Sequence, residues 1–242
     1  MKLKASLHLH TAEDRSSDGP LIGYSIYQLI DRAALLGFKV LGLTCHRVFV
    51  YRRAYGRYAK QRGILLLPGV ELELAEMFNR PHVVVLNCGP DIEKVTTLNE
   101  LAAYKKRQPQ IFVLAAHPLV DRHFSLAASQ LEECSHLFDA FEHTWFYSRW
   151  FNSNRRVAAL ARRFHKPFLA TADLHHLKYL STDYAVIDSR EFSAAAIFAA
   201  IKAGRFSNVS RPKFWLPAVL LVLYLFAAGR VVLTWRRLFA KS

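Results

Sequence analysis

Short apolar runs alternate with helix-like segments over the first 205 residues of this chain. The alternation predicts an α/β fold with a mainly parallel sheet, because parallel strands need crossover connections that are usually helical. Two further observations support this fold class. Gly37 and Gly63 stand where helix C-caps belong, just before an apolar run. Histidines and carboxylates repeatedly follow the apolar runs, as functional groups do at strand ends. A barrel and a doubly wound sheet both remain open.

The predicted elements follow one another in the order that such a fold requires. Eight apolar runs are predicted to be strands: Leu3–His8, Lys39–Thr44, Ile64–Val70, His82–Leu86, Ile111–Ala115, Ala140–Glu142, Phe168–Thr171 and Ala185–Ile187. Six segments between and after them are predicted to be helices: Ser25–Leu36, Val50–Arg62, Ile92–Lys106, Leu126–Cys134, Asn152–Phe164 and Ser193–Ala203. In the first of these, Leu29, Ala33 and Leu36 share one face. Ser25 and Ser193 are N-cap candidates.

Composition narrows the class of protein. The net charge of +14 attracts phosphates, nucleic acid and anionic lipid alike, and so it does not choose between them. The 3 cysteines are an odd number without paired spacing, which gives no disulfide framework and indicates a reducing compartment. The N-terminal residues MKLKASLHLH lack the apolar segment of a secretory signal.

Residues 214–235 read FWLPAVLLVLYLFAAGRVVLTW, a run long enough for a membrane span of about 20 residues. Trp215 and Trp235 lie near its two ends, as interfacial aromatic residues do. Arg230 interrupts the run, but its head group can reach the interface. We therefore expect a single-pass anchor, with a buried or interfacial amphipathic helix as the alternative. Basic residues flank both ends and set no orientation, whereas the missing signal and unpaired cysteines favour a cytoplasmic main domain.

Nine histidines and carboxylates are candidate metal ligands, and most stand where an apolar run ends. They are His8, His10, Asp18, His46, Glu71, His82, His117, Asp173 and His175. The carboxyl ends of parallel strands meet at one edge of a sheet, so we expect these side chains to gather there. His82 departs from the pattern, because it begins its apolar run.

The spacing of these residues suits a metal site. His8 and His10, two positions apart on an extended segment, point their imidazoles to the same side. Asp173 and His175 repeat this arrangement with mixed ligands. A carboxylate such as Glu71 can bridge two metal ions, which an imidazole cannot. Imidazole and carboxylate together suit Zn, Mn or Fe. The sequence thus favours a hydrolytic metalloenzyme.

In this order, the motifs resemble those of the PHP (polymerase and histidinol phosphatase) superfamily over residues 1–206. The motifs are His8-Leu9-His10-Thr11 with Ser17-Asp18-Gly19, Leu43-Thr44-Cys45-His46, Pro68-Gly69-Val70-Glu71, Ala116-His117-Pro118, Phe141-Glu142 and Thr171-Ala172-Asp173-Leu174-His175. His82 opens the strand after the third motif, and residues 199–205 resemble the closing helix of the family. The pair of histidines alone is a weak signal, but the ordered set is specific.

The resemblance implies a distorted (β/α)7 barrel with two or three divalent metal ions at its strand ends. It assigns His8, His10, Glu71 and Asp173 to one ion, Glu71, His82 and His117 to a second, and Asp18, His46 and His175 to a third. His8, His10, Glu71, His117, Asp173 and His175 form the expected catalytic core. The implied reaction is hydrolysis of a phosphate ester by metal-activated hydroxide.

Two positions depart from the family's usual pattern. Cys45 stands where Asp is usual before His46, which puts the third ion in question; it is either a softer ligand or a small buried thiol. Arg47 stands where a small or polar residue is common, and it either contacts a substrate phosphate or lies on the surface. Glu142 is expected behind the ligands or lining the site near a substrate phosphate, with a surface carboxylate as the alternative.

The expected organisation is a phosphoesterase domain over residues 1–206, a basic linker over 207–213, the anchor over 214–235 and a short basic tail over 236–242. Residues 47–62 read RVFVYRRAYGRYAKQR. This mixture of basic and aromatic residues is typical of single-stranded nucleic-acid binding, of contact with anionic lipid, or of the solvated face of a barrel helix.

We therefore expect a membrane-tethered, metal-dependent phosphoesterase that acts on a phosphorylated small molecule or on a nucleotide or nucleic acid. The alternative is a metal-binding but inactive module that serves as a membrane-anchored interaction or regulatory domain. Cys45 favours the inactive module, and the otherwise complete ligand set opposes it.

Overall fold

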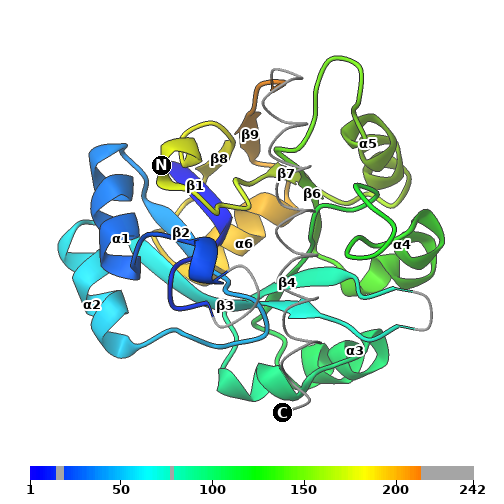
Figure 1. Cartoon of the computed structure of the whole chain (residues 1–242), viewed down its shortest axis with the longest axis horizontal. Helices are drawn as coiled ribbons and strands as arrows, with labels where there is room; N and C mark the ends of the chain where they lie inside the picture. The colour runs from blue at the N-terminus through cyan, green and yellow to red at the C-terminus, as the bar shows by residue number, and fades with distance from the viewer. Residues whose placement is uncertain (15–18, 77–78, 214–242) are drawn as a thin grey trace, which may run out of the picture.

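The computed structural model describes residues 1–14, 19–76 and 79–213 and shows an α/β barrel that is nearly closed (Figure 1). The described strands form one sheet in the order β7-β6-β5-β4-β3-β2-β1-β8-β9. Their bounds are β1 Lys2–Leu9, β2 Val40–Leu43, β3 Leu65–Glu73, β4 His82–Leu86, β5 Phe112–Ala115, β6 Ala140–His143, β7 Phe168–Ala170, β8 Tyr184–Asp188 and β9 Phe206–Val209. The helices are α1 Ile26–Leu35, α2 Arg53–Gln61, α3 Leu98–Arg107, α4 Ala128–Cys134, α5 Asn154–Arg163 and α6 Ala194–Lys202.

The barrel closes between its two edge strands through a side chain. The Asn208 carboxamide on β9 accepts a hydrogen bond from the Ala170 amide of β7 (2.9 Å) and donates one to the Phe168 carbonyl (2.7 Å). The interior is filled by inward side chains of the strands, and Phe198 and Ile201 of α6 pack into the same cluster. In Figure 1, α6 lies behind the ring of strands. It therefore plugs one end of the barrel.

The other helices cover the outside of the barrel. Apolar faces of α1 and α2 pack with β2 residues in one cluster, and α3, α4 and α5 pack with residues of β3, β4 and β5 in another. Ser25 accepts a hydrogen bond from the Gln28 amide in a capping box, which fixes the start of α1 as expected. Gly37 and Gly63 have φ values of 76° and 66°, the left-handed conformation that favours glycine after a helix.

Strand directions decide which residues meet at one edge. β1 pairs in parallel with β2, and β2 with β3, whereas β4 runs antiparallel to both β3 and β5. The register of β3 and β4 sets Glu73 opposite His82, so β4 begins where β3 ends. β8 is also reversed: its pairing with β1 joins Asp188 to Lys2. We call the edge where β1, β2, β3, β5, β6, β7 and β9 end, and where β4 and β8 begin, the carboxyl edge.

Each strand and helix expected from the sequence is present within the described residues, with shifted bounds, but two differences matter. The helix expected over Ile92–Lys106 is a 3-10 turn (Pro90–Lys94) followed by α3, which Thr97 caps. The strand β9 was not expected. It overlaps the predicted linker over residues 207–213 and pairs with β8. No helix within residues 1–14, 19–76 and 79–213 is long and apolar enough to cross a membrane. The predicted anchor over 214–235, the tail over 236–242 and Asp18 lie outside the described residues.

Candidate metal centre

Backbone pairing brings the last motif to the end of β1. The His10 amide donates to the Leu174 carbonyl (3.2 Å), and the Leu174 amide donates to the His8 carbonyl (3.3 Å). This short bridge sets Asp173 and His175 beside His8 and His10 at the end of β1, although β7 and β1 are not neighbours in the sheet.

A second bridge joins the loop after β2 to β3. The Arg47 amide donates to the Glu71 carbonyl (2.8 Å), and the Glu71 amide donates to the Cys45 carbonyl (3.3 Å). The bridge places His46 beside Glu71. The four distant segments therefore converge at the carboxyl edge through backbone hydrogen bonds, as the strand-end positions of these motifs predicted.

Glu71 lies fully buried at the centre of the convergence. Its Oε2 atom lies 3.0 Å from the Nε2 atoms of His8 and His46 and 3.1 Å from that of His10. Asp173 Oδ1 lies 3.5 Å from His8 Nε2 and 3.4 Å from His10 Nε2. One carboxylate oxygen thus faces three imidazoles, with a second carboxylate beside two of them.

The other oxygen of Glu71 faces a different pair of imidazoles. Oε1 lies 2.9 Å from His82 Nδ1 and 3.2 Å from His117 Nε2. His82 reaches this place because β4 is reversed, which explains its exception to the strand-end pattern. Ser125 contacts the outer nitrogen of His117 at 3.4 Å.

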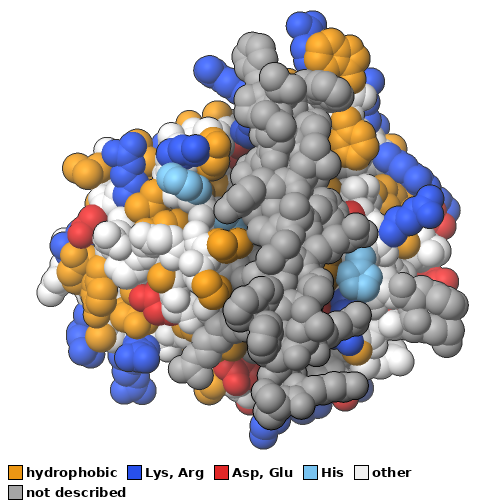
Figure 2. All heavy atoms as spheres, viewed as in Figure 1, with side chains coloured by type: hydrophobic (Ala, Val, Ile, Leu, Met, Phe, Trp, Pro, Cys, Tyr) orange, Lys and Arg blue, Asp and Glu red, His pale blue; other side chains and the backbone are white. Residues whose placement is uncertain are grey.

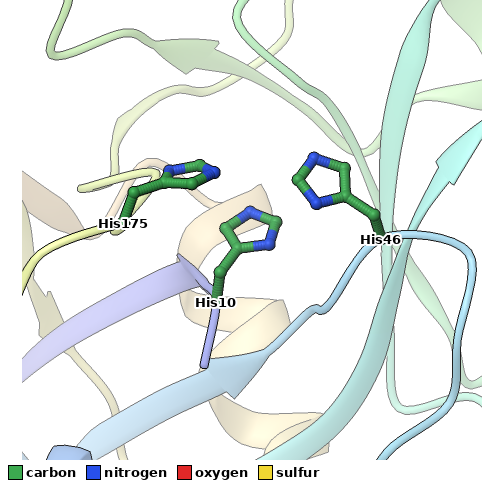
Figure 3. A group of neighbouring side chains, drawn as sticks. All are labelled: His10, His46 and His175. Atoms are coloured by element: carbon green, nitrogen blue, oxygen red, sulfur yellow. The ribbon is translucent and has the colours of Figure 1, made fainter. Parts of the chain in front are cut away.

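His175 approaches from the side that is open to solvent, with 37% of its side chain exposed. Its ring centroid lies 4.5 Å from that of His10, and the His10 and His46 centroids are 4.2 Å apart. The three rings surround a common space, as Figure 3 shows. Three sets of donor atoms lie close enough to share a cation: His8, His10, Glu71 and Asp173; His46, Glu71 and His82; and His10, His46 and His175.

The buried donor atoms fit divalent metal ions. His8 Nε2, His10 Nε2, His82 Nε2 and Glu71 Oε2 are buried and make no hydrogen bond of proper geometry within the described residues, although several lie about 3 Å apart. The short distances reflect convergence rather than hydrogen bonding. Such buried nitrogen and oxygen atoms, aimed at one point, are typical ligands of Zn, Mn or Fe.

Glu142 orients the inner part of this set. It is 1% exposed and pairs through Oε1 with His8 Nδ1 at 2.9 Å. It also accepts hydrogen bonds from the Thr171 hydroxyl and the His117 amide. Both oxygens are occupied and buried, so Glu142 stands behind the ligands. The sequence analysis also allowed contact with a substrate phosphate and a position on the surface. The burial and the hydrogen bonds of Glu142 correct both of these expectations.

Asp14 has a matching role that the sequence analysis missed. Its Oδ2 atom lies 3.1 Å from His10 Nδ1 and 2.9 Å from His46 Nδ1, and it accepts the His46 amide at 2.9 Å. The signal was a carboxylate four residues after His10 in the same loop. Burial alone would raise the pKa of Asp14, but the hydrogen bonds with His10 and His46 hold it well below its usual range.

Carboxylates also change the titration of the imidazoles. Burial lowers the pKa of His46, but Glu71 outweighs it and raises the pKa to about 9. The pKa of His8 is likewise raised well above its ordinary value, since Glu71, Glu142 and Asp173 outweigh its burial. A metal ion that binds these imidazoles would have to displace their protons.

Strained backbone marks the same positions. Arg47, His117 and Asp173 have φ values of 54°, 26° and 41°, a region that non-glycine residues seldom occupy. Each lies at or beside a candidate ligand. Strain of this kind persists where the surrounding structure holds a residue in place, and it clusters at functional sites.

Cys45 and Arg47, the two residues that depart from the usual pattern of the family, lie in different environments. Cys45 is fully buried, its Sγ lies 3.5 Å from Thr11 Oγ1, and burial raises its pKa. It belongs to none of the donor sets, so it is the small buried thiol of the two alternatives. The Arg47 side chain is 55% exposed and pairs with Glu73, which also binds Arg80 at 3.0 Å.

A cavity of about 470 Å³ adjoins the Asp14 side of the centre. Its lining residues are Ala12, Glu13, Asp14, Val48, Phe49, Val50, Tyr51, Arg52, Tyr55 and Glu93. Only the first part of the basic and aromatic segment faces this cavity. Further along, Tyr58 and Arg62 pair with Asp31 of α1, so that part packs against a neighbouring helix.

Comparisons with known proteins concern part of the sequence and the fold. Residues 151–206 match a family model described as PHP-associated. A comparison with curated proteins finds no match to the sequence.

Several solved structures share the fold. A two-domain protein from Bacteroides vulgatus containing a predicted PHP-like metal-dependent phosphoesterase is 16% identical, with a TM-score of 0.66 over 87% of this chain and 65% of that one. PsfC from Pseudomonas syringae is 15% identical, with a TM-score of 0.62 over 95% of this chain and 99% of that one. The lesion-specific endonuclease PfuEndoQ from Pyrococcus furiosus is 15% identical, with a TM-score of 0.56 over 86% and 57%.

At these identities the structures show a common fold, and this chain spans 65% of the first and 57% of the third. The family match covers the end of the domain, and the ordered motifs cover the rest. The family match over residues 151–206 and the shared fold therefore support the resemblance of the chain to the PHP superfamily.

Proposed function

We propose that this protein is a metal-dependent phosphoesterase that residues 214–235 tether to a membrane. The observation that carries the proposal is the position of Glu71, whose two oxygens face two different groups of imidazoles. A carboxylate in this position can be shared by two cations. Two divalent ions held together supply hydroxide at neutral pH and offset the charge of a phosphoryl group.

The protein's own residues would position these groups. Glu142 and Asp14 hold the Nδ1 atoms of His8, His10 and His46, which aims their Nε2 atoms at Glu71. Cys45 is buried with a raised pKa and is thus a protonated thiol, unsuited to act as a nucleophile. These features favour direct attack of water over a covalent enzyme intermediate.

Metal number and identity belong to the proposal. The donor sets suit two ions that share Glu71 and a third between His10, His46 and His175. Mixed imidazole and carboxylate ligands suit Zn, Mn or Fe. Asp18, which the family resemblance assigned to the third ion, is not needed for the set that the described residues form.

The substrate is a phosphomonoester of a small molecule or a phosphodiester of a nucleotide or nucleic acid. The basic charge supports either, and the structural neighbours include proteins described as phosphoesterases and as an endonuclease. Arg47, which directly follows His46 and is half exposed, is our candidate for contact with the substrate phosphate.

The full-length protein in detergent, loaded with Mn²⁺ or Zn²⁺, tests the reaction. We expect turnover of p-nitrophenyl phosphate, bis-p-nitrophenyl phosphate or a short oligonucleotide, and loss of it after chelation. Glu71→Gln should abolish turnover and reduce the bound metal measured by elemental analysis. Glu132→Gln, an exposed carboxylate in a surface ion pair, is the matched control. Bound metal without turnover of any substrate would support the inactive module.

The tether is tested separately. We expect the full chain in the membrane fraction, with its metal centre on the cytoplasmic side, and a chain ending at Lys213 in the soluble fraction. Recovery of the full chain in the soluble fraction after lysis contradicts the spanning segment. Protease protection of the domain in right-side-out vesicles tests its cytoplasmic location.

A further inference from the structure

The described part of the chain ends at the same edge as the metal centre. β8 begins at the carboxyl edge, and β9 runs antiparallel to it, with Val209 opposite Tyr184. β9 therefore points towards the carboxyl edge and delivers residues 210–213 there. The apolar run that we propose as the anchor begins at the next residue, Phe214.

Lys213 is fixed at this edge by a buried charge. Its ammonium group pairs with Asp183, whose side chain is fully buried, and its amide donates to the Tyr147 carbonyl at 2.9 Å. The Tyr147 hydroxyl lies 3.0 Å from Ser210 Oγ. The last described residues therefore pack on the domain, which leaves little slack between the domain and the proposed span.

The loop that holds Lys213 also touches the metal centre. This loop connects β6 to α5 over residues 144–153. Its Trp145 indole donates to Asp173 Oδ2 at 3.4 Å, two residues before Tyr147. The exit of the chain and the solvent-exposed side of the centre thus share one loop.

The same edge carries side chains that suit a lipid interface. In the loops after β1, β5 and β6, the residues Leu21, Phe124, Trp150 and Phe151 are 53%, 40%, 82% and 52% exposed. Exposed Arg122, Arg149, Lys178 and Arg211 lie in loops of this edge as well. On the visible part of this face, hydrophobic and basic side chains lie together around the rim (Figure 2). Aromatic and basic residues are enriched where proteins meet anionic bilayers.

Exposed apolar residues occur at both ends of the barrel, so they do not by themselves show which end faces a membrane. Leu35 and Phe192 are 81% and 43% exposed at the opposite end, the first as the last residue of α1 and the second after β8. The tether makes the difference, because a span that starts beside Lys213 holds the carboxyl edge against the membrane. It also keeps Leu35 and Phe192 on the far side of the domain.

We propose that the mouth of the metal centre faces the bilayer and that its substrate is a phosphate group on a membrane lipid. This inference rests on the proposed phosphoesterase function. For a lipid phosphomonoester, water forms a new bond to phosphorus, the bond between phosphorus and the lipid oxygen breaks, and that oxygen takes the proton. A diacylglycerol and inorganic phosphate are released from a phosphatidate.

The first test uses the full chain reconstituted with Mn²⁺ in phosphatidylcholine vesicles that contain dioleoyl phosphatidate. We expect its kcat/KM to exceed that for soluble glycerol 3-phosphate by roughly tenfold or more, because the tether confines enzyme and substrate to one surface. The double variant Trp150→Ala, Phe151→Ala should lower turnover of the vesicle lipid and leave that of p-nitrophenyl phosphate unchanged. The matched control, Leu35→Ala with Phe192→Ala, should change neither.

The outcomes separate the two proposals. Turnover of p-nitrophenyl phosphate or of an oligonucleotide without turnover of phosphatidate overturns the lipid substrate and leaves the phosphoesterase intact. No turnover of any substrate by the metal-loaded protein refutes the phosphoesterase itself.

A second test asks only which edge faces the membrane. In vesicles of brominated phosphatidylcholine, tryptophan at the interface is quenched. Trp150→Phe should remove a quenched component of the emission, and Leu35→Trp should add an unquenched one. Quenching of the tryptophan at position 35, or unquenched emission from Trp150, overturns the orientation whatever the activity.

Discussion

Two buried carboxylates aim the imidazoles of the metal centre, and they differ in how the fold holds them. Glu142 lies on β6, where it pairs with His8 and binds the backbone of His117. Asp14 lies in the loop after β1, where it pairs with both His10 and His46. We call the part of the centre around Glu142 and His8 the strand side. We call the part around Asp14, His10 and His46 the loop side.

This difference indicates that the two sides have different functions in metal binding. A ligand aimed from a strand is held by the sheet, so the strand side should bind its ion most rigidly. The loop side borders the cavity of about 470 Å³, and Asp14 lines that cavity. We expect the loop side to exchange its ion more readily and to meet the substrate.

Glu71 belongs to both sides, so its loss should have the largest effect. Glu71→Gln removes the negative charge that both sides share and replaces one of the two carboxylate oxygens by an amide nitrogen. We expect metal affinity to fall on both sides by more than the ~100-fold limit typical of an orienting residue, with activity lost. Isothermal titration with Mn²⁺ measures the affinities. Retention of either ion at its original affinity would show that Glu71 does not bridge the two sides.

Removing one orienting carboxylate at a time tests whether the strand side and the loop side bind metal differently. Glu142→Gln and Asp14→Asn should each weaken metal binding by about 10- to 100-fold, because each amide preserves shape but loses the charge that fixes an imidazole. Glu142→Gln should act mainly on the tighter site, through His8. Asp14→Asn should act mainly on the weaker site, through His46, and less on the tighter site, through His10. Two-site titrations with each variant distinguish them. Equal losses at both sites in both variants would mean that the two sides are one coupled unit.

The contrast between the two sides also shows what the sequence could predict. Glu142 ends an apolar run, so its position beside the other strand-end motifs could be anticipated from the strand pattern. Asp14 sits in a loop without periodicity, and the family motif drew attention to Asp18 instead. Only the folded loop shows that Asp14 returns to His10 and His46.

The fold could be predicted from the sequence to a similar extent. Apolar runs and helix caps located the strands and helices, because each signal is local. The reversal of β4, which brings His82 to the site, depends on pairing between strands and left no local signal. β9 is short and half polar, and it is a strand because β8 pairs with it and Asn208 closes the barrel.

Protons and metal ions should compete for His46, and this competition should give the loop side the next largest effect. Glu71 raises the pKa of His46 to about 9 from an ordinary value near 6.5. The proton on His46 therefore stabilises the metal-free fold fully below pH 6.5, and this stabilisation is lost as pH rises through 9. Metal must displace the same proton, so its affinity rises over this window, by up to about tenfold per pH unit for one proton.

The metal-induced increase in Tm should accordingly grow from pH 6.5 to 9. Scanning fluorimetry with and without Mn²⁺ measures it. The matched variant His46→Gln lacks the titrating group and should show a shallower increase. A Tm increase that falls with pH in the unmodified protein would contradict proton competition at the centre.

The smallest effect should come from Arg47, which lies outside the ligand set on the rim of the loop side. Its guanidinium is exposed and pairs with Glu73, so a substrate phosphate has to compete with that carboxylate and with solvent. We expect Arg47→Ala to raise KM about 3- to 10-fold with little change in kcat, as for loss of one charged hydrogen bond. Arg163→Ala, which removes another exposed, ion-paired arginine, is the control. An unchanged KM for Arg47→Ala would assign Arg47 to the surface alone and leave the cavity beside Asp14 as the region through which the loop side meets the substrate.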